Sequence, residues 1–184
     1  FHLRTGLTWS DGRPMGARDF AWSWRRVLDP ATASRHASLL FPIRNAERFN
    51  RGELSDTTAL GLAAPDDSTF VVTLETPTAY FLFLTTYYTF LPLPRHVIQA
   101  YGLRWTRPEH LVGNGPFLWT YWRQNDRYEF QPNPRYWNAP QVRLRKVVAY
   151  TVDDLNTSAN LYKSGAVDWS PSGYIPSPYL PFLT

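Results

Sequence analysis

The stretch from Val112 to Trp137, VGNGPFLWTYWRQNDRYEFQPNPRYW, constrains the fold more than any other part of the chain. An Asn-Gly-Pro turn at residues 114–116 precedes two runs with strand composition, at residues 117–122 and 127–131. The polar residues 124–126 between these runs are typical of a tight turn. The segment therefore predicts an antiparallel hairpin packed by large aromatic side chains.

Aromatic residues make up 16% of the chain, and their spacing predicts which rings share a face. In a regular strand, Trp119 and Tyr121 share one face and Trp122 lies on the other. Trp22 and Trp24 are two positions apart, so on a helix only one of them packs well into the core. Packing in a core or between lobes is the predicted role for most of these rings.

The rest of the chain alternates predicted helices with predicted strands. The helices are expected at residues 17–28, 33–40, 45–50, 78–85, 94–101 and 153–163, and the further strands at 1–4, 60–64, 69–74, 146–152 and 167–170. Helices interspersed with hairpins indicate an α+β or mixed α/β fold, with mixed sheets flanked by helices. The expected seam between two lobes lies at residues 113–115.

Composition excludes several classes of protein. With 184 residues, of which 43% are hydrophobic, the chain has enough apolar surface for a buried core. It has no cysteine, which excludes disulfides, thiolate nucleophiles and cysteine-bound metals. No run of 18 apolar residues is present, so no transmembrane helix is expected. The first residues read as the middle of a domain, and a processed terminus or a fragment boundary is expected there.

The net charge of +4 does not indicate nucleic-acid binding. The charged residues are interspersed, and no run of five or six like charges occurs. A nucleic-acid site would need a basic patch, and the sequence predicts none.

Motifs for catalysis, metal binding and phosphate binding are also missing from the sequence. The four histidines do not occur at metal-ligand spacing, and there is no G-x-S-x-G elbow or glycine-rich phosphate loop. The acid pairs Asp66-Asp67 and Asp153-Asp154 occur where a turn and a helix cap favour an acid. We therefore predict no catalytic residue, no metal site, no cofactor and no enzymatic activity.

A series of motifs resembles one family in collinear order. The motifs are FHLRTGLTWSDGRP, ARDFAWSWRRVLDPATAS, LGLAAPDDSTFVVTLETPTAYF, RWTRPEHLVGNGPF, NPRYWN and LYKSGAVDW. Together they resemble the extracytoplasmic oligopeptide-binding proteins of ABC importers, solute-binding protein family 5. The resemblance covers nearly all 184 residues and favours the oligopeptide branch over the dipeptide and nickel branches.

The resemblance implies a periplasmic-binding-protein-like fold of type II, cluster C. Residues 1–113 would form most of an accessory lobe and residues 114–184 part of the first main ligand-binding lobe, with the second main lobe absent. For that reason the chain by itself is expected to bind no peptide measurably.

The implied function is capture of oligopeptides outside the cytoplasmic membrane and delivery to the transmembrane subunits of an ABC permease. The family resemblance implies a monomer that is periplasmic or lipid-anchored on the outer face of that membrane. Alternatives are a family member with another cargo (a murein peptide, a dipeptide, a sugar or a metal chelate), a sensor with the same fold, and a carbohydrate- or peptide-processing enzyme domain.

One position is carried over from the family as a ligand contact. His36 stands where some oligopeptide binders present a Tyr to the peptide, and Arg35 and Ser38 are its candidate neighbours. The alternative is that His36 is an ordinary surface residue on a helix. A departure from the family is Gly16, which stands where Thr is frequent and which predicts a weaker cap on the helix at residues 17–28.

Overall fold

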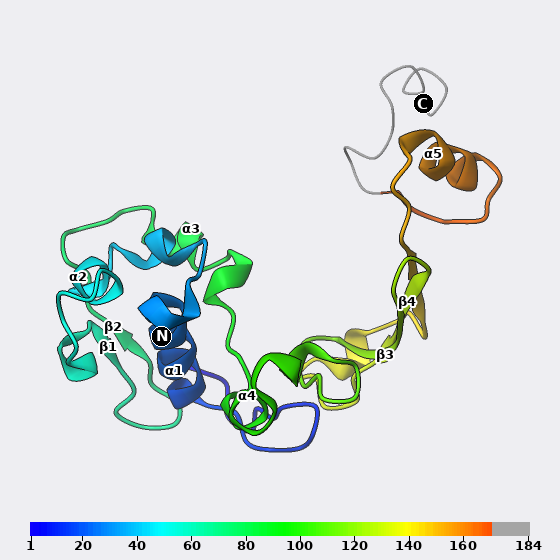
Figure 1. The fold of residues 1–184 in the computed structure, drawn as a ribbon. Coiled ribbons are helices and arrows are strands. Elements are labelled where there is room, and N and C mark those ends of the chain that lie inside the picture. Colours follow the sequence, from blue (N-terminus) through cyan, green and yellow to red (C-terminus); the bar gives the residue numbers. More distant parts are fainter. Residues whose placement is uncertain (171–184) are drawn as a thin grey trace. The chain divides into compact units, whose positions relative to one another are not determined.

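The computed structural model describes residues 1–170, which fall into two compact units (Figure 1). The first unit comprises Phe1–Leu118 and Pro132–Arg143, and the second comprises Trp119–Gln131 and Leu144–Thr184, described to residue 170. Short helices and small antiparallel sheets confirm the predicted mixed fold class. The assignment of residues 1–113 and 114–184 to two lobes remains a prediction.

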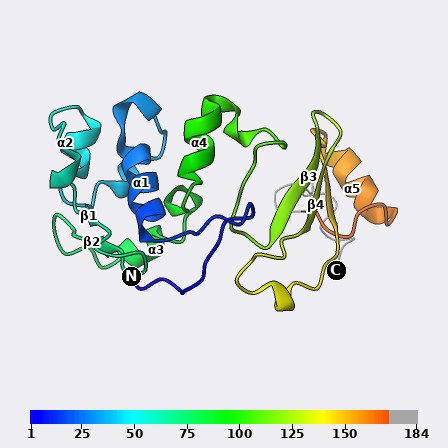
Figure 2. The ribbon, with the colours of Figure 1, turned by 90° about the horizontal axis from the view of Figure 1, so that it is seen from below.

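Most helices are short. The α-helices are α1 (Ala17–Leu28), α2 (Ala46–Asn50), α3 (Phe81–Leu84), α4 (Arg95–Tyr101) and α5 (Leu155–Lys163), and 3₁₀ turns occupy Pro30–Thr32, Ala37–Leu40, Thr57–Ala59, Tyr88–Phe90, Gly102–Thr106 and Ala139–Gln141. Within the first unit α1 lies between α2 and α4 (Figure 2).

The bounds predicted for α1 are confirmed, and Gly16 provides no side-chain cap at its start, in line with the weaker cap predicted there. The Asp19 carboxylate accepts a hydrogen bond of 2.9 Å from the Gly16 N–H, and the Ala17 N–H donates to the Asp67 carbonyl at 2.8 Å. A Cβ at Gly16 would lie only 2.7 Å from that carbonyl oxygen. Glycine at this position therefore lets the 66–67 turn approach closely enough for its carbonyl to accept from the free Ala17 N–H of the first turn.

Trp24 stands at the centre of the first unit's core. Its ring meets Phe70 and Phe90 edge-on, with centroids 4.9 and 5.0 Å apart, and its indole N–H donates to the Phe90 carbonyl at 2.8 Å. Leu28 and Leu40 are fully buried in the same core. Of the two helix tryptophans, Trp24 packs inward, whereas Trp22 is only half-buried.

Two helical predictions need correction. Residues 33–40 do not form one helix, because Ala33 adopts the left-handed backbone conformation (φ 49°) that ends the preceding 3₁₀ turn. Only Ala37–Leu40 is helical there, as a 3₁₀ turn. The helix expected at 78–85 is reduced to α3, whereas the predictions for α2, α4 and α5 are confirmed to within two residues at each end.

The first hairpin is much shorter than predicted. Strand β1 (Leu62–Ala63) pairs antiparallel with β2 (Val71–Val72), with Leu62 opposite Val72. The expected strand at residues 1–4 contributes a single bridge, between His2 and Thr69. No strand forms at residues 167–170, contrary to the prediction.

The aromatic hairpin is confirmed as part of a three-stranded sheet in the order β3 (Phe117–Arg123), β4 (Arg127–Pro132) and β5 (Val147–Tyr150). Strands β4 and β5 are antiparallel. Asn125 has the left-handed conformation (φ 58°) in the turn between β3 and β4. The Trp119 and Trp122 rings pack together, with centroids 5.7 Å apart, so the prediction that they point to opposite faces is wrong.

The Asn-Pro-Arg-Tyr-Trp motif is hydrogen-bonded to the 114–116 turn. Asn133 is buried, its side-chain amide donates to the Gly115 carbonyl at 2.9 Å, and its main-chain N–H donates to the Pro116 carbonyl at 2.8 Å. The Asn133 side-chain oxygen accepts from the Arg135 N–H at 3.0 Å. The motif therefore has a structural role within the first unit.

Candidate functional site

The candidate ligand residue His36 directly precedes the 3₁₀ turn Ala37–Leu40. Its backbone conformation is neither extended nor helical. Ala37 and Leu40 are buried and hold this turn on the core, while the His36 ring stays half-buried at the surface. The backbone that carries the imidazole is therefore held in place by the buried residues of this turn.

Two tyrosines from a distant segment surround His36. The His36 Nε2 atom lies 2.8 Å from the Tyr88 hydroxyl, and the imidazole meets the rings of Tyr87 and Tyr88 edge-on, each with centroids 5.6 Å apart. Tyr87 and Tyr88 also pack together, with centroids 4.3 Å apart. We call these three residues the His36 cluster.

The hydroxyl groups of the His36 cluster are linked in a chain. The Tyr87 hydroxyl donates to the Tyr88 hydroxyl at 3.2 Å, and this hydrogen bond raises the pKa of Tyr87 above its ordinary value. The contact between the Tyr88 hydroxyl and Nε2 of His36 can run in either direction, because its donor depends on the imidazole tautomer. In either tautomer Nδ1 of the imidazole remains a polar group that a ligand can meet.

Large apolar side chains are exposed along the segment that carries the two tyrosines. Between residues 80 and 91 the exposed large apolar residues are Tyr80, Leu82, Phe83, Tyr87, Tyr88 and Leu91, and Phe83 keeps 79% of its surface exposed. Several large apolar side chains exposed in one short segment are typical of a surface that binds a ligand or another protein. The His36 cluster therefore adjoins an apolar surface with a few polar groups, a composition common in ligand sites.

The structure does not bring the other two predicted site residues into the cluster. Arg35 and Ser38 are exposed, and within residues 1–170 neither side chain makes a hydrogen bond or an ion pair. Sequence reasoning missed Tyr87 and Tyr88. The adjacent tyrosines in an apolar segment were a signal for a binding surface, but their separation of about fifty residues from His36 concealed the contact.

Two of the other histidines are engaged in contacts within the first unit. His96 pairs with Asp11 at 2.7 Å, and His110 stacks on Tyr101 with centroids 3.7 Å apart. Within residues 1–170 no three side chains of His, Asp or Glu converge as metal ligands would. In the same range, no helix has the length and apolar character needed to cross a membrane.

Comparison with known proteins identifies relatives along the whole chain. The sequence profile of the bacterial extracellular solute-binding proteins, family 5, matches residues 1–182. The probable deoxycholate-binding periplasmic protein YgiS of Escherichia coli is 41% identical over 181 residues, which cover 96% of this chain and 34% of that protein. The periplasmic oligopeptide-binding protein OppA of Salmonella typhimurium is 38% identical over 170 residues, 91% of this chain and 31% of that protein.

A solved structure agrees with these sequence relationships. The crystal structure of Haemophilus influenzae OppA in complex with RPPGFSPFR superposes with a TM-score of 0.94 at 36% identity, covering all of this chain and 36% of that one. The chain thus spans about a third of the length of the relatives it matches. The chain belongs to the bacterial extracellular solute-binding proteins, family 5.

Proposed function

We propose that the intact protein containing this chain is the substrate-binding component of an ABC importer, which captures oligopeptides outside the cytoplasmic membrane and delivers them to the permease. The observation that carries this proposal is the TM-score of 0.94 to an OppA structure solved with a peptide, at 36% identity. Family members grip an extended peptide through its main chain, as a sheet grips an added strand.

In this proposal the His36 cluster lines one side-chain pocket for the peptide. The exposed faces of Tyr87 and Tyr88 would contact apolar peptide side chains, and the imidazole would form a hydrogen bond with a polar group of the peptide. Arg35 and Ser38 would lie at the rim, where their unpaired polar groups can meet a polar peptide side chain. Such a wide, partly polar pocket accepts many side chains, which gives loose sequence preference.

Location and partners follow from the family. We assign the intact protein to the periplasm, or to a lipid anchor on the outer face of the cytoplasmic membrane, and expect it to act as a monomer. Its partners would be the peptide and the transmembrane permease subunits, with no role for nucleic acid. Two of its relatives are named as periplasmic binding proteins, which supports binding without catalytic turnover.

A second cargo has specific support. The relative named as a probable deoxycholate-binding protein is 41% identical, against 38% for OppA of Salmonella typhimurium. A bile acid offers an apolar body and one carboxylate, and the exposed apolar surface at residues 80–91 suits such a body.

The deciding experiment uses the intact protein purified without denaturation. Mass spectrometry of the co-purified ligand identifies the cargo, and calorimetric titration with the ligand-free protein then compares random-sequence tripeptides to pentapeptides, murein tripeptide and deoxycholate. The proposal predicts co-purified peptides of varied sequence and tight binding of the peptide pool. Tight binding of deoxycholate alone would replace the peptide proposal with the second cargo, and turnover of any peptide would contradict the binding role.

A further inference from the structure

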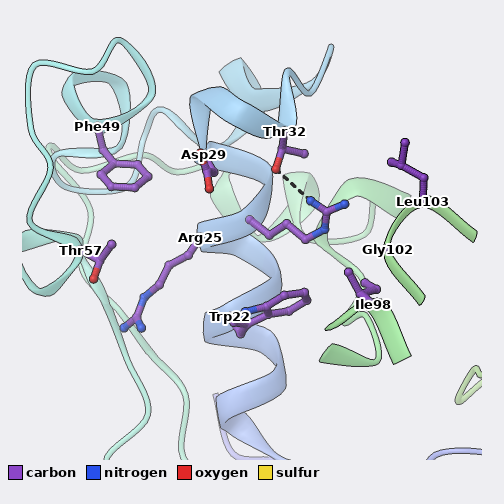
Figure 3. A pocket seen from close by; sticks show the side chains of 10 residues that line it. Trp22, Arg25, Asp29, Thr32, Phe49, Thr57, Ile98, Gly102 and Leu103 are labelled. Atoms are coloured by element: carbon purple, nitrogen blue, oxygen red, sulfur yellow. Dashed lines mark hydrogen bonds between the residues drawn. The ribbon is translucent and has the colours of Figure 1, made fainter. Parts of the chain in front are cut away.

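A groove of about 460 Å³ crosses the outer face of α1 within the first unit (Figure 3). Trp22, Arg25, Arg26 and Asp29 recur at spacings of three and four residues, so they form one stripe along the helix. The volume lies in the range of small-molecule sites, about 300–1,000 Å³. No part of the His36 cluster lines this groove.

The walls of the groove come from the elements on either side of α1. In Figure 3 the Arg25 side chain extends toward Thr57, with Phe49 on the same side, while Trp22 lies toward Ile98 and the 102–103 turn. Leu103 is 92% exposed at this edge. The lining thus offers an apolar surface on both sides of a basic stripe.

The two arginines in the stripe retain unused hydrogen-bond donors. Arg26 donates from Nη1 to the Thr32 hydroxyl at 2.9 Å, which fixes one edge of its guanidinium and leaves the other edge without a partner among residues 1–170. Arg25 donates from Nη2 to the Leu62 carbonyl at 3.2 Å, and its buried Nε has no partner among the described residues. A guanidinium with a free edge is suited to a carboxylate, which it can bind through two parallel hydrogen bonds.

Asp29 lines the groove, and Asp56 precedes the groove residue Thr57. The Asp29 carboxylate accepts from the Ala31 N–H at 2.9 Å, and the Asp56 carboxylate accepts from the Thr58 N–H at 2.8 Å, so each caps its own 3₁₀ turn. Neither acid forms an ion pair with Arg25 or Arg26 within the described residues. Arg25 and Arg26 are two cations and Asp29 is one anion, so the groove lining carries one net positive charge.

A further cation strengthens the Trp22 side of the groove. The Arg95 guanidinium carbon lies 6.0 Å from the centroid of the Trp22 ring. The positive charge of Arg95 therefore lies beside the Trp22 ring, and the uncovered part of the half-buried indole can contact a flat apolar group.

We propose that this groove binds a small carboxylate with a flat apolar body, with its carboxylate on the free edge of Arg26 and its body against Trp22 and Leu103. The ligand needs both the carboxylate and the apolar body. An inorganic anion would leave the apolar walls exposed, and a neutral aromatic would leave the arginine unpaired. The groove is separate from the His36 cluster, so this inference does not depend on the proposed peptide function.

The test uses 2-naphthoate as the probe on the intact protein, with 2-naphthol and inorganic phosphate as comparison probes. Saturation-transfer NMR and calorimetry measure binding to the unaltered protein and to the Arg26→Gln, Trp22→Ala and Arg18→Gln variants. Arg18→Gln is the matched control, since it removes one positive charge from an α1 side chain that is 75% exposed and pairs with Asp67.

A probe of this size is expected to bind with a dissociation constant of roughly 0.1–1 mM. We expect Arg26→Gln to weaken 2-naphthoate binding about tenfold or more, Trp22→Ala to abolish the saturation transfer to the ring, and Arg18→Gln to change neither. 2-Naphthol and phosphate should bind at least about tenfold more weakly.

Three results would overturn the proposal: no 2-naphthoate binding, equal weakening by Arg26→Gln and Arg18→Gln, or phosphate binding as tight as that of 2-naphthoate. Thermal unfolding of each variant confirms that it is folded. Arg26→Lys keeps the charge without the planar edge and is expected to recover only part of the affinity. Peptide affinity measured on the same variants should stay unchanged, which separates this site from the proposed function.

Discussion

The indole N–H of Trp24 donates a hydrogen bond of 2.8 Å to the main-chain carbonyl of Phe90, so α1 holds the segment that carries Tyr87 and Tyr88. The Ser23 hydroxyl supports the same attachment, since it accepts from the Leu93 N–H at 2.8 Å. The position of the His36 cluster therefore depends on a core residue that does not belong to it.

Trp24→Phe should destabilise the protein by about 1–3 kcal/mol, because the Phe90 carbonyl loses its buried donor. Urea unfolding measures the change. Trp169→Phe is the control, because Trp169 is 76% exposed and a surface substitution should stay within about 0.5 kcal/mol. Equal effects of the two substitutions would show that the Trp24 hydrogen bond contributes nothing to stability.

His36→Ala and Tyr88→Phe should each reduce affinity for peptides with an apolar side chain in the pocket, and the two effects should not add. Their direct contact at 2.8 Å predicts a coupling of about 0.5–3 kcal/mol. Peptide titration of the intact protein, its two single variants and the double variant measures that coupling. Unchanged affinity for a varied peptide set in both single variants would remove the His36 cluster from the binding site.

Gly16→Ala should destabilise the first unit by about 1–3 kcal/mol, because the added Cβ would lie 2.7 Å from a main-chain oxygen of Asp67. Gly113→Ala is the matched control, since no atom lies within 4 Å of the corresponding Cβ. Thermal unfolding of both variants distinguishes a steric effect from a general loss of glycine. A stabilised Gly16→Ala variant would show that the 66–67 turn moves freely away.

The stability of the 66–69 turn should depend on pH in the acid range. Hydrogen bonds from the Ser68 hydroxyl and N–H and from Thr69 lower the pKa of Asp66 from 3.8 to about 2 in the folded protein. A lowered folded-state pKa means that the stabilisation is fully present above pH 3.8 and is lost as the pH falls toward 2.

Asp66→Asn tests this dependence. The stability difference between the unaltered protein and Asp66→Asn should be constant above pH 3.8 and shrink as the pH falls toward 2. Chemical unfolding at a series of pH values provides the curve, with the exposed Glu53→Gln as the control carboxylate substitution. A difference that does not change over this pH range would contradict the assignment to Asp66.

The sequence alone predicted the elements whose ends are determined locally. Helix α1 has an acid in its first turn and is followed by Asp29-Pro30, and α5 has an Asp154 cap and ends before Gly165, so each is specified by neighbours in the chain. The predictions failed where tertiary packing required a backbone conformation that differs from the one the local pattern favours. Ala33 is left-handed because the chain turns there to place Ala37 and Leu40 in the core.

The sequence by itself determined the family, the mixed fold class and the aromatic hairpin, because these depend on collinear motifs, hydrophobic period and turn residues. Only the tertiary structure decided that Trp24 enters the core while Trp22 lines a groove, that Gly16 allows the 66–67 turn to approach α1, and that Tyr88 meets His36. These contacts join residues far apart in the chain, and their geometry depends on how the elements pack, which no local pattern encodes.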